Sequence, residues 1–149
     1  MLHRVFLSFH YSDLWRAQIV RNSGAAESLA SGGFLDAASW ESILRRGDAA
    51  IRAHIDQQLD GTSVTIVLIG AETANRAYVS YEIEQSIARG NGIFGIRIHT
   101  LKDARGATDS PGPIPKGLIR VHAPIYDWEF GQLQVWIEDA VKKAKEIRP

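Results

Sequence analysis

The most informative absences from this 149-residue sequence are cysteine, excess charge and long apolar segments. Without cysteine the chain cannot form disulfides, thiolate zinc sites or a cysteine nucleophile, and the absence fits the cytoplasm, where we expect the protein. The 17 Lys and Arg residues balance 17 Asp and Glu residues, which argues against nucleic-acid and membrane partners. No apolar run approaches the roughly 20 residues of a membrane span, and the N-terminus lacks a signal-peptide pattern. The length predicts one globular domain over residues 1–149.

Several motifs of catalysis and cofactor binding are also missing. The sequence has no GxxxxGK[ST] phosphate loop, no HExxH zinc motif and no GxSxG nucleophile elbow. The string Gly90-x-Gly92-x-x-Gly95 matches a dinucleotide fingerprint, but it leads into a predicted strand instead of joining a strand to a helix. The five histidines have no ligand-like spacing. We therefore expect no bound metal and no Rossmann-type cofactor.

Strand and helix patterns alternate along the chain. Apolar and β-branched runs predict strands at residues 4–11, 33–37, 64–69, 92–99 and 118–126. Apolar residues at helical spacing predict helices at residues 13–22, 47–59, 76–89 and 132–147, with a loop or helical turn at 38–46. In the first helix, Trp15, Ile19 and Val20 are expected to face the core. The alternation favours an α/β fold in which helices cover both faces of a five-stranded parallel sheet.

Residues 62–89 form the most regular block of the sequence. A continuous apolar run at 64–69 predicts a strand that is buried on both faces. In the helix that follows, Val79, Ile83 and Ile87 form the predicted buried stripe, and Tyr78 and Glu82 form a second row about 100° round the helix. Glu82 is then expected at the edge of the core, near the carboxyl end of a strand, where such folds bind ligands. From periodicity alone it is either a reactive group or a surface charge.

Several segments resemble a known family. The opening RVFLSFHYSD resembles the first strand and turn of Toll/interleukin-1 receptor (TIR) domains, and Tyr78-x-x-x-Glu82 resembles their W-x-x-x-E motif with tyrosine in place of tryptophan. More closely, FLSFHYSD-x-WRAQ-x-VRN, then Trp40, then TSVTIVLIGAETANRAYVSYEIEQSI-x-RGNG are similar to the TIR-like proteins of bacterial Thoeris anti-phage systems. The order of elements agrees over essentially the whole chain. The resemblance implies a flavodoxin-like, three-layer TIR fold.

The resemblance also implies an activity and a set of site residues. It implies an enzyme that consumes NAD+ as substrate, needs no separate cofactor, and makes a cyclic ADP-ribose isomer or a related conjugate that signals to a partner effector. Glu82 would be the catalytic glutamate. Trp40 would belong to a loop that folds over the substrate. The residues that would lie beside the nucleotide are Ser8, Phe9, His10 and Asp13.

Other predicted contacts have structural alternatives. Asp36 ends a predicted strand at the favoured edge, where it either binds the ligand or forms a turn. Tyr78, like Phe9, either contacts substrate or packs in the core. Asn75 and Arg76 are interpreted first as a helix cap and a surface charge, and second as phosphate or ribose contacts.

Two other functions stay open at this stage. The chain could be a non-catalytic TIR-like adaptor that acts by self-association, or a flavodoxin-like module that binds a flavin or nucleotide without turning it over. A homo-oligomer is also possible, because many TIR enzymes complete their site with a neighbouring subunit.

Overall fold

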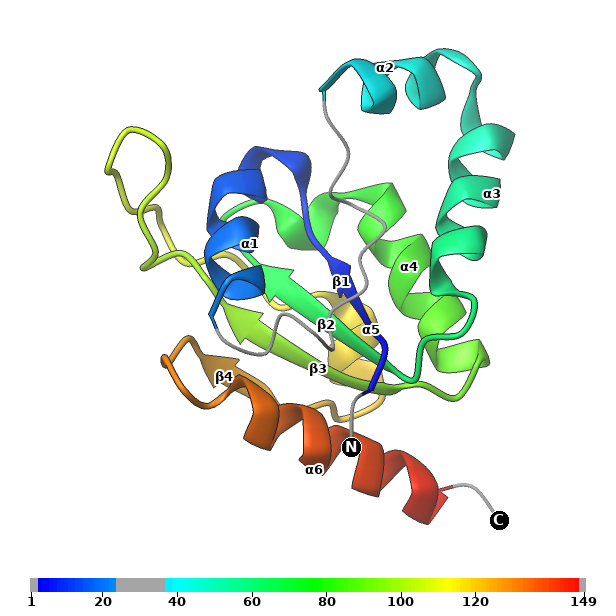
Figure 1. Cartoon of the computed structure of the whole chain (residues 1–149), viewed down its shortest axis with the longest axis vertical. Helices are drawn as coiled ribbons and strands as arrows, with labels where there is room; N and C mark the ends of the chain where they lie inside the picture. Colours follow the sequence, from blue (N-terminus) through cyan, green and yellow to red (C-terminus); the bar gives the residue numbers. More distant parts are fainter. Residues whose placement is uncertain (1–2, 24–36, 148–149) are drawn as a thin grey trace.

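The computed structural model describes residues 3–23 and 37–147, and its centre is a parallel sheet in the order β1-β2-β3-β4 (Figure 1). The strands are β1 (Val5–Ser8), β2 (Val64–Ile69), β3 (Gly92–Arg97) and β4 (Ile125–Asp127). The helices are η1 (Tyr11–Asp13), α1 (Leu14–Arg21), α2 (Ala37–Arg45), α3 (Asp48–Leu59), η3 (Thr73–Asn75), α4 (Ala77–Ala88), α5 (Lys116–Arg120) and α6 (Leu133–Ile147). The predicted α/β architecture with a parallel sheet is confirmed.

The described residues contain four strands instead of the five predicted. The strand predicted at 33–37 lies outside the described residues except for Ala37, which begins α2. In the segment 118–126 the chain first completes α5 and reaches β4 only at Ile125. Pro115 precedes α5, and a proline is well suited to a helix start because it has no N–H group of its own to satisfy there.

The central strand β2 aligns its neighbours. All of its residues are buried, as the continuous apolar run predicts. Val64 pairs with Val5 of β1 on one side and with Gly92 of β3 on the other, and both pairings are parallel. The carboxyl ends of these strands therefore meet at one edge of the sheet, with the turns that follow them.

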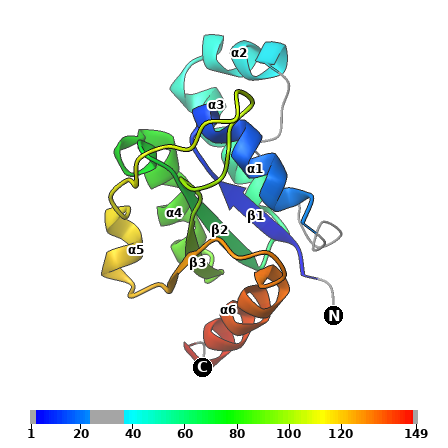
Figure 2. The same cartoon turned by 90° about the vertical axis from the view of Figure 1, so that its left-hand side faces the viewer.

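Helices cover both faces of the sheet, and Figure 2 shows α4 and α5 on the opposite side from α1 and α6. Because side chains alternate along a strand, β1 and β2 supply both cores. The core under α1 and α6 includes Val5, Leu7, Ile66, Leu68, Trp136 and Ile137. The opposite cores include Phe6, Ile51, Ile55 and Leu59 beside α3, and Val67, Ile69, Val79 and Ile83 beside α4. Each such buried side chain contributes about 1.5–3 kcal/mol.

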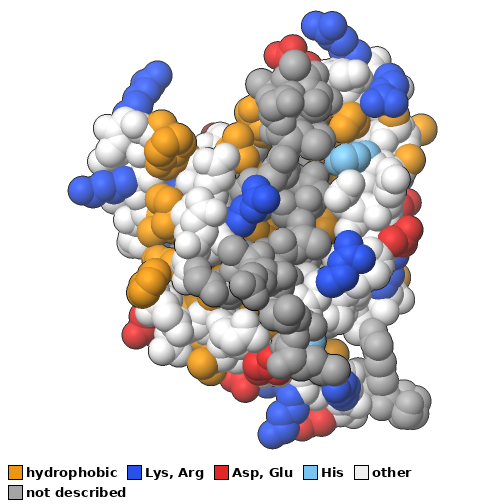
Figure 3. Space-filling model, in the orientation of Figure 1, with side chains coloured by type: hydrophobic (Ala, Val, Ile, Leu, Met, Phe, Trp, Pro, Cys, Tyr) orange, Lys and Arg blue, Asp and Glu red, His pale blue; other side chains and the backbone are white. Residues whose placement is uncertain are grey.

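Charged side chains are spread over the surface. On the face shown in Figure 3, basic and acidic groups lie at separate points around the molecule, in keeping with the balanced charge of the sequence. Among the described residues, no helix combines the length and apolar character that a bilayer crossing requires.

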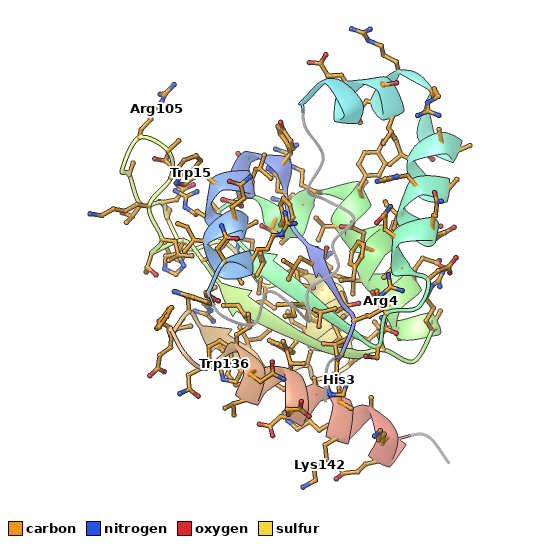
Figure 4. All side chains as sticks on the ribbon, viewed as in Figure 1. His3, Arg4, Trp15, Arg105, Trp136 and Lys142 are labelled. Atoms are coloured by element: carbon orange, nitrogen blue, oxygen red, sulfur yellow. The ribbon has the colours of Figure 1, made fainter. Side chains whose placement is uncertain are left out.

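Helix α1 does not bury all the residues that its spacing predicts. Ala17 and Val20 are fully buried, but Trp15 is 53% exposed and Ile19 is 36% exposed; Trp15 is labelled in Figure 4. The inward prediction is therefore right for Val20 and wrong for Trp15 and Ile19. The helix is rotated because it buries Arg16, which is only 4% exposed.

Candidate active site

A cavity of about 490 Å³ lies at the carboxyl edge of the sheet. Its walls come from three parts of the chain: the end of β1 with the turn after it, the helices α2 and α3, and the start of α4. Ligands bind at this edge in parallel α/β folds, and the volume is typical of small-molecule sites. The cavity is therefore the candidate site for chemistry.

Glu82 lies on the α4 wall of the cavity, with Ser8 of β1 beside it. The Ser8 hydroxyl donates a hydrogen bond of 2.7 Å to Oε1 of Glu82. Ser8 is fully buried and is not among the residues that line the cavity, and its contact with a substrate stays a prediction. Burial raises the pKa of Glu82 to about 8, against the opposing effect of the Ser8 hydrogen bond. A carboxyl group with a pKa near neutrality in a cavity is typical of catalytic sites, so these surroundings favour a reactive group over a surface charge.

Buried hydrogen bonds hold the part of α4 that carries Glu82 against β2. Ser86 donates to the Glu82 carbonyl at 2.7 Å, and Thr65 of β2 donates to the Ser86 hydroxyl at 2.7 Å. Asn91 extends the network by donating to Thr65 at 3.2 Å. These bonds fix the rotation of α4 and hence the direction of the carboxyl group. Periodicity missed the network; its signals are a serine four residues after Glu82 and a threonine within an apolar strand.

Three of the predicted substrate-binding residues, Phe9, His10 and Tyr78, line the same cavity as Glu82. Phe9 and Tyr78 also pack against the cores on opposite faces of the sheet, so packing and a place in the cavity are compatible for both. Burial and the nearby positive charge of Arg76 lower the pKa of His10, whose Nδ1 accepts a 3.1 Å hydrogen bond from the Ser12 N–H group. Both effects favour the neutral form of the His10 imidazole. Contact of these residues with a substrate stays a prediction.

Asp13 lies outside the cavity lining, in a buried ion pair with Arg16. The Arg16 Nη1 and Asp13 Oδ1 atoms are 2.8 Å apart. Arg16 also donates to the carbonyls of Leu101 and Ala107, at 2.8 and 3.1 Å, and so fastens the long loop after β3. Burial raises the pKa of Asp13, and Arg16 opposes that rise. Asp13 therefore has a structural role in this ion pair, and its contact with a nucleotide stays a prediction.

Two predicted residues cannot be placed against the cavity. Asp36 lies outside the described residues. Trp40 lies in α2, where a loop or helical turn was predicted, but its side chain is outside the described part of the structure. From the same helix, Leu44 lines the cavity. The predicted covering role of Trp40 therefore stays a prediction.

Comparison with known proteins agrees with these observations. A family model described as "Thoeris protein ThsB, TIR-like domain" matches residues 6–103, which include β1 except its first residue, all of α4 and every described residue that lines the cavity. A curated protein of Bacillus cereus (strain MSX-D12), named "Putative cyclic ADP-D-ribose synthase ThsB1", is 37% identical over 161 residues, covering 100% of this chain and 83% of that protein. The chain therefore belongs to the family of Thoeris ThsB proteins with a TIR-like domain.

Proposed function

We propose that this protein cleaves NAD+ between nicotinamide and ribose and forms a cyclic ADP-ribose isomer as a signal for a partner effector in anti-phage defence. NAD+ is the substrate, and no separate cofactor takes part. The observation that carries the proposal is the Glu82 carboxyl group, which lies on the cavity wall with a pKa of about 8 and a hydrogen bond from Ser8. The name of the Bacillus relative supports the same class of activity.

One carboxylate is chemically sufficient for this cleavage. In NAD+ the nicotinamide is a cationic pyridinium; when its bond to the ribose breaks, the ring takes the electron pair and leaves as a neutral molecule. No general acid is needed, whereas ordinary glycosidases use two carboxyl groups. The ribose becomes an oxocarbenium-like cation, which an ionised Glu82 stabilises. Electrostatic stabilisation of this kind is worth about a hundred- to thousandfold in rate.

The attacking group decides the product. If water attacks the ribose cation, ADP-ribose forms; if a hydroxyl group of the same molecule attacks, a ring closes and the hydroxyl proton passes to Glu82 or to solvent. Proximity can favour the internal attack strongly when the molecule is held folded and water is kept out. The aromatic rings of Phe9 and Tyr78 in the cavity are suited to stack on the bases of a folded dinucleotide.

The test is to incubate purified protein with NAD+ and to identify the products by chromatography and mass spectrometry. Wild-type protein should release nicotinamide and a cyclic product, and Glu82→Gln should slow release at least about a hundredfold. Glu84→Gln is the matched control, because Glu84 lies on the same helix but outside the cavity and pairs with Arg120 at 2.6 Å. The assay should cover a range of protein concentrations and include extract of phage-infected cells.

The adaptor hypothesis makes the opposite prediction. If the protein acts only by self-association, bacteria that carry the Glu82→Gln variant should survive phage infection as well as bacteria that carry the wild-type protein. Equal nicotinamide release by Glu82→Gln and wild type would show that Glu82 has been assigned wrongly.

A further inference from the structure

The described lining of the cavity contains one Lys or Arg, which is Arg76, and one Asp or Glu, which is Glu82. Arg76 is the N-cap residue of α4, and Glu82 lies further along the same helix. A separation of six residues corresponds to about 9 Å along a helix axis. The cavity therefore presents a cation and a carboxyl group from two levels along the axis of α4.

NAD+ carries the complementary charges at a similar spacing. In NAD+ the bond that breaks joins a ribose carbon to the positively charged pyridinium ring. From that carbon the negative diphosphate begins about five single bonds away, or roughly 6 Å when the chain is extended. A carboxylate oxygen in contact with the ribose adds about 3 Å. When the reacting carbon lies at Glu82, the diphosphate therefore reaches the level of Arg76.

Arg76 can accept such a ligand at little cost. Its guanidinium pairs with Glu72 at 3.1 Å, and the two side chains are 46% and 63% exposed. Exposed pairs of this kind contribute little to stability, so a phosphate can replace Glu72. The guanidinium group also matches phosphate oxygens in shape and charge. Arg76 and His10 both line the cavity, Arg76 from the start of α4 and His10 from the turn after β1.

We propose that Arg76 binds the diphosphate of the substrate, exchanging Glu72 for the phosphate oxygens, and thereby makes the site selective for dinucleotides over phosphate-free nucleosides. The inference rests on the proposed function, and it names the residue of the same cavity that binds the negative charge of the substrate. Arg76 holds the diphosphate while Glu82 acts at the ribose, so its loss should weaken binding more than the chemical step.

Two measurements test the inference. The first compares steady-state kinetics on NAD+ and on nicotinamide riboside, which has no phosphate, for wild type, Arg76→Gln, Arg76→Lys and Arg120→Gln. We expect Arg76→Gln to raise KM for NAD+ about 10- to 100-fold, the usual value of a hydrogen-bonded charge, with kcat within about threefold. The kcat/KM for nicotinamide riboside should not change, and Arg76→Lys should recover part of the loss. Arg120→Gln, which breaks an equally exposed ion pair outside the cavity, should match wild type.

The second measurement separates this inference from the proposed function. Calorimetry with ADP-ribose reports binding without turnover, and Arg76→Gln should weaken it about 10- to 100-fold, whereas Glu72→Gln should leave it unchanged or tighter. If wild type does not cleave NAD+, the proposed function fails and this binding experiment alone decides the role of Arg76. The role is refuted if ADP-ribose binds wild type and Arg76→Gln equally, if it does not bind wild type, or if Arg120→Gln weakens it as much.

Discussion

Replacing Glu82 by glutamine should slow NAD+ cleavage at least about a hundredfold and should stabilise the fold, with a gain in stability that grows with pH. Raising a carboxyl pKa from 4.5 to about 8 corresponds to about 5 kcal/mol between the two protonation states. Because the folded-state pKa of Glu82 lies above the unfolded-state value, its contribution to stability is fully present below about pH 4.5 and is lost as pH rises to about 8. Glutamine keeps the shape of the protonated acid and cannot ionise. The expected gain over wild type is near zero at pH 4, about 3 kcal/mol at pH 7 and at most about 5 kcal/mol above pH 8.

Urea unfolding of wild type and Glu82→Gln at pH 4, 5.5, 7 and 8.5 measures this gain, because titrations of all other groups cancel in the difference. Glu84→Gln is the control: its exposed pair with Arg120 predicts a change within about 1 kcal/mol at every pH. A difference between Glu82→Gln and wild type that stays constant from pH 4 to 8.5 would refute the reasoning. It would mean that the Glu82 carboxyl is as well solvated in the folded chain as in the unfolded one.

Three further predictions concern the surroundings of this carboxyl group. The kcat/KM for NAD+ should rise with pH as Glu82 loses its proton near pH 8, and Ser8→Ala should move the midpoint of the pH–rate profile upward, because the Ser8 hydrogen bond lowers the pKa of Glu82. Arg16→Met should lower the free energy of unfolding, measured in urea, by about 3–5 kcal/mol, because it leaves Asp13 buried without its partner. The double variant Arg16→Met with Asp13→Asn should recover part of this loss. An equal loss of stability in the single and double variants would contradict the ion-pair account. Gly70→Ala should lower the melting temperature by the equivalent of about 1–3 kcal/mol, because its Cβ would lie 2.1 Å from Asp13 Oδ2, and an unchanged melting temperature would show that the close approach is absent.

The segment from β2 to α4 could be predicted because the pattern of apolar residues within it determines how each element is buried. A continuous apolar run can be buried on both faces only in a covered sheet, and β2 is buried throughout. The spacing of Val79 and Ile83 sets which side of α4 meets that sheet, and both residues are buried. Once that face is fixed, the position of Glu82 at the margin of the core follows from helix geometry.

The predictions that failed concern side chains whose partners lie far away in the sequence. In α1, Arg16 faces the core and the apolar residues Trp15 and Ile19 are exposed. Burial of Arg16 is possible because the carbonyl groups of Leu101 and Ala107 accept hydrogen bonds from its guanidinium group. A local pattern cannot show that a loop about 85 residues later supplies those acceptors. The Thr65–Ser86 hydrogen bond behind Glu82 was missed for the same reason.

The contact between Ser8 and Glu82 also constrains when the protein can become active. The two residues are 74 positions apart in the sequence, and they meet only when β1 has paired with β2. Contacts between distant segments carry a loop-closure cost, and proteins rich in such contacts fold more slowly. A chain emerging from the ribosome, or one with β1 detached, lacks the cavity wall that desolvates the carboxyl group. The proposed activity would therefore require the completed fold, because only the folded chain places Ser8 against Glu82.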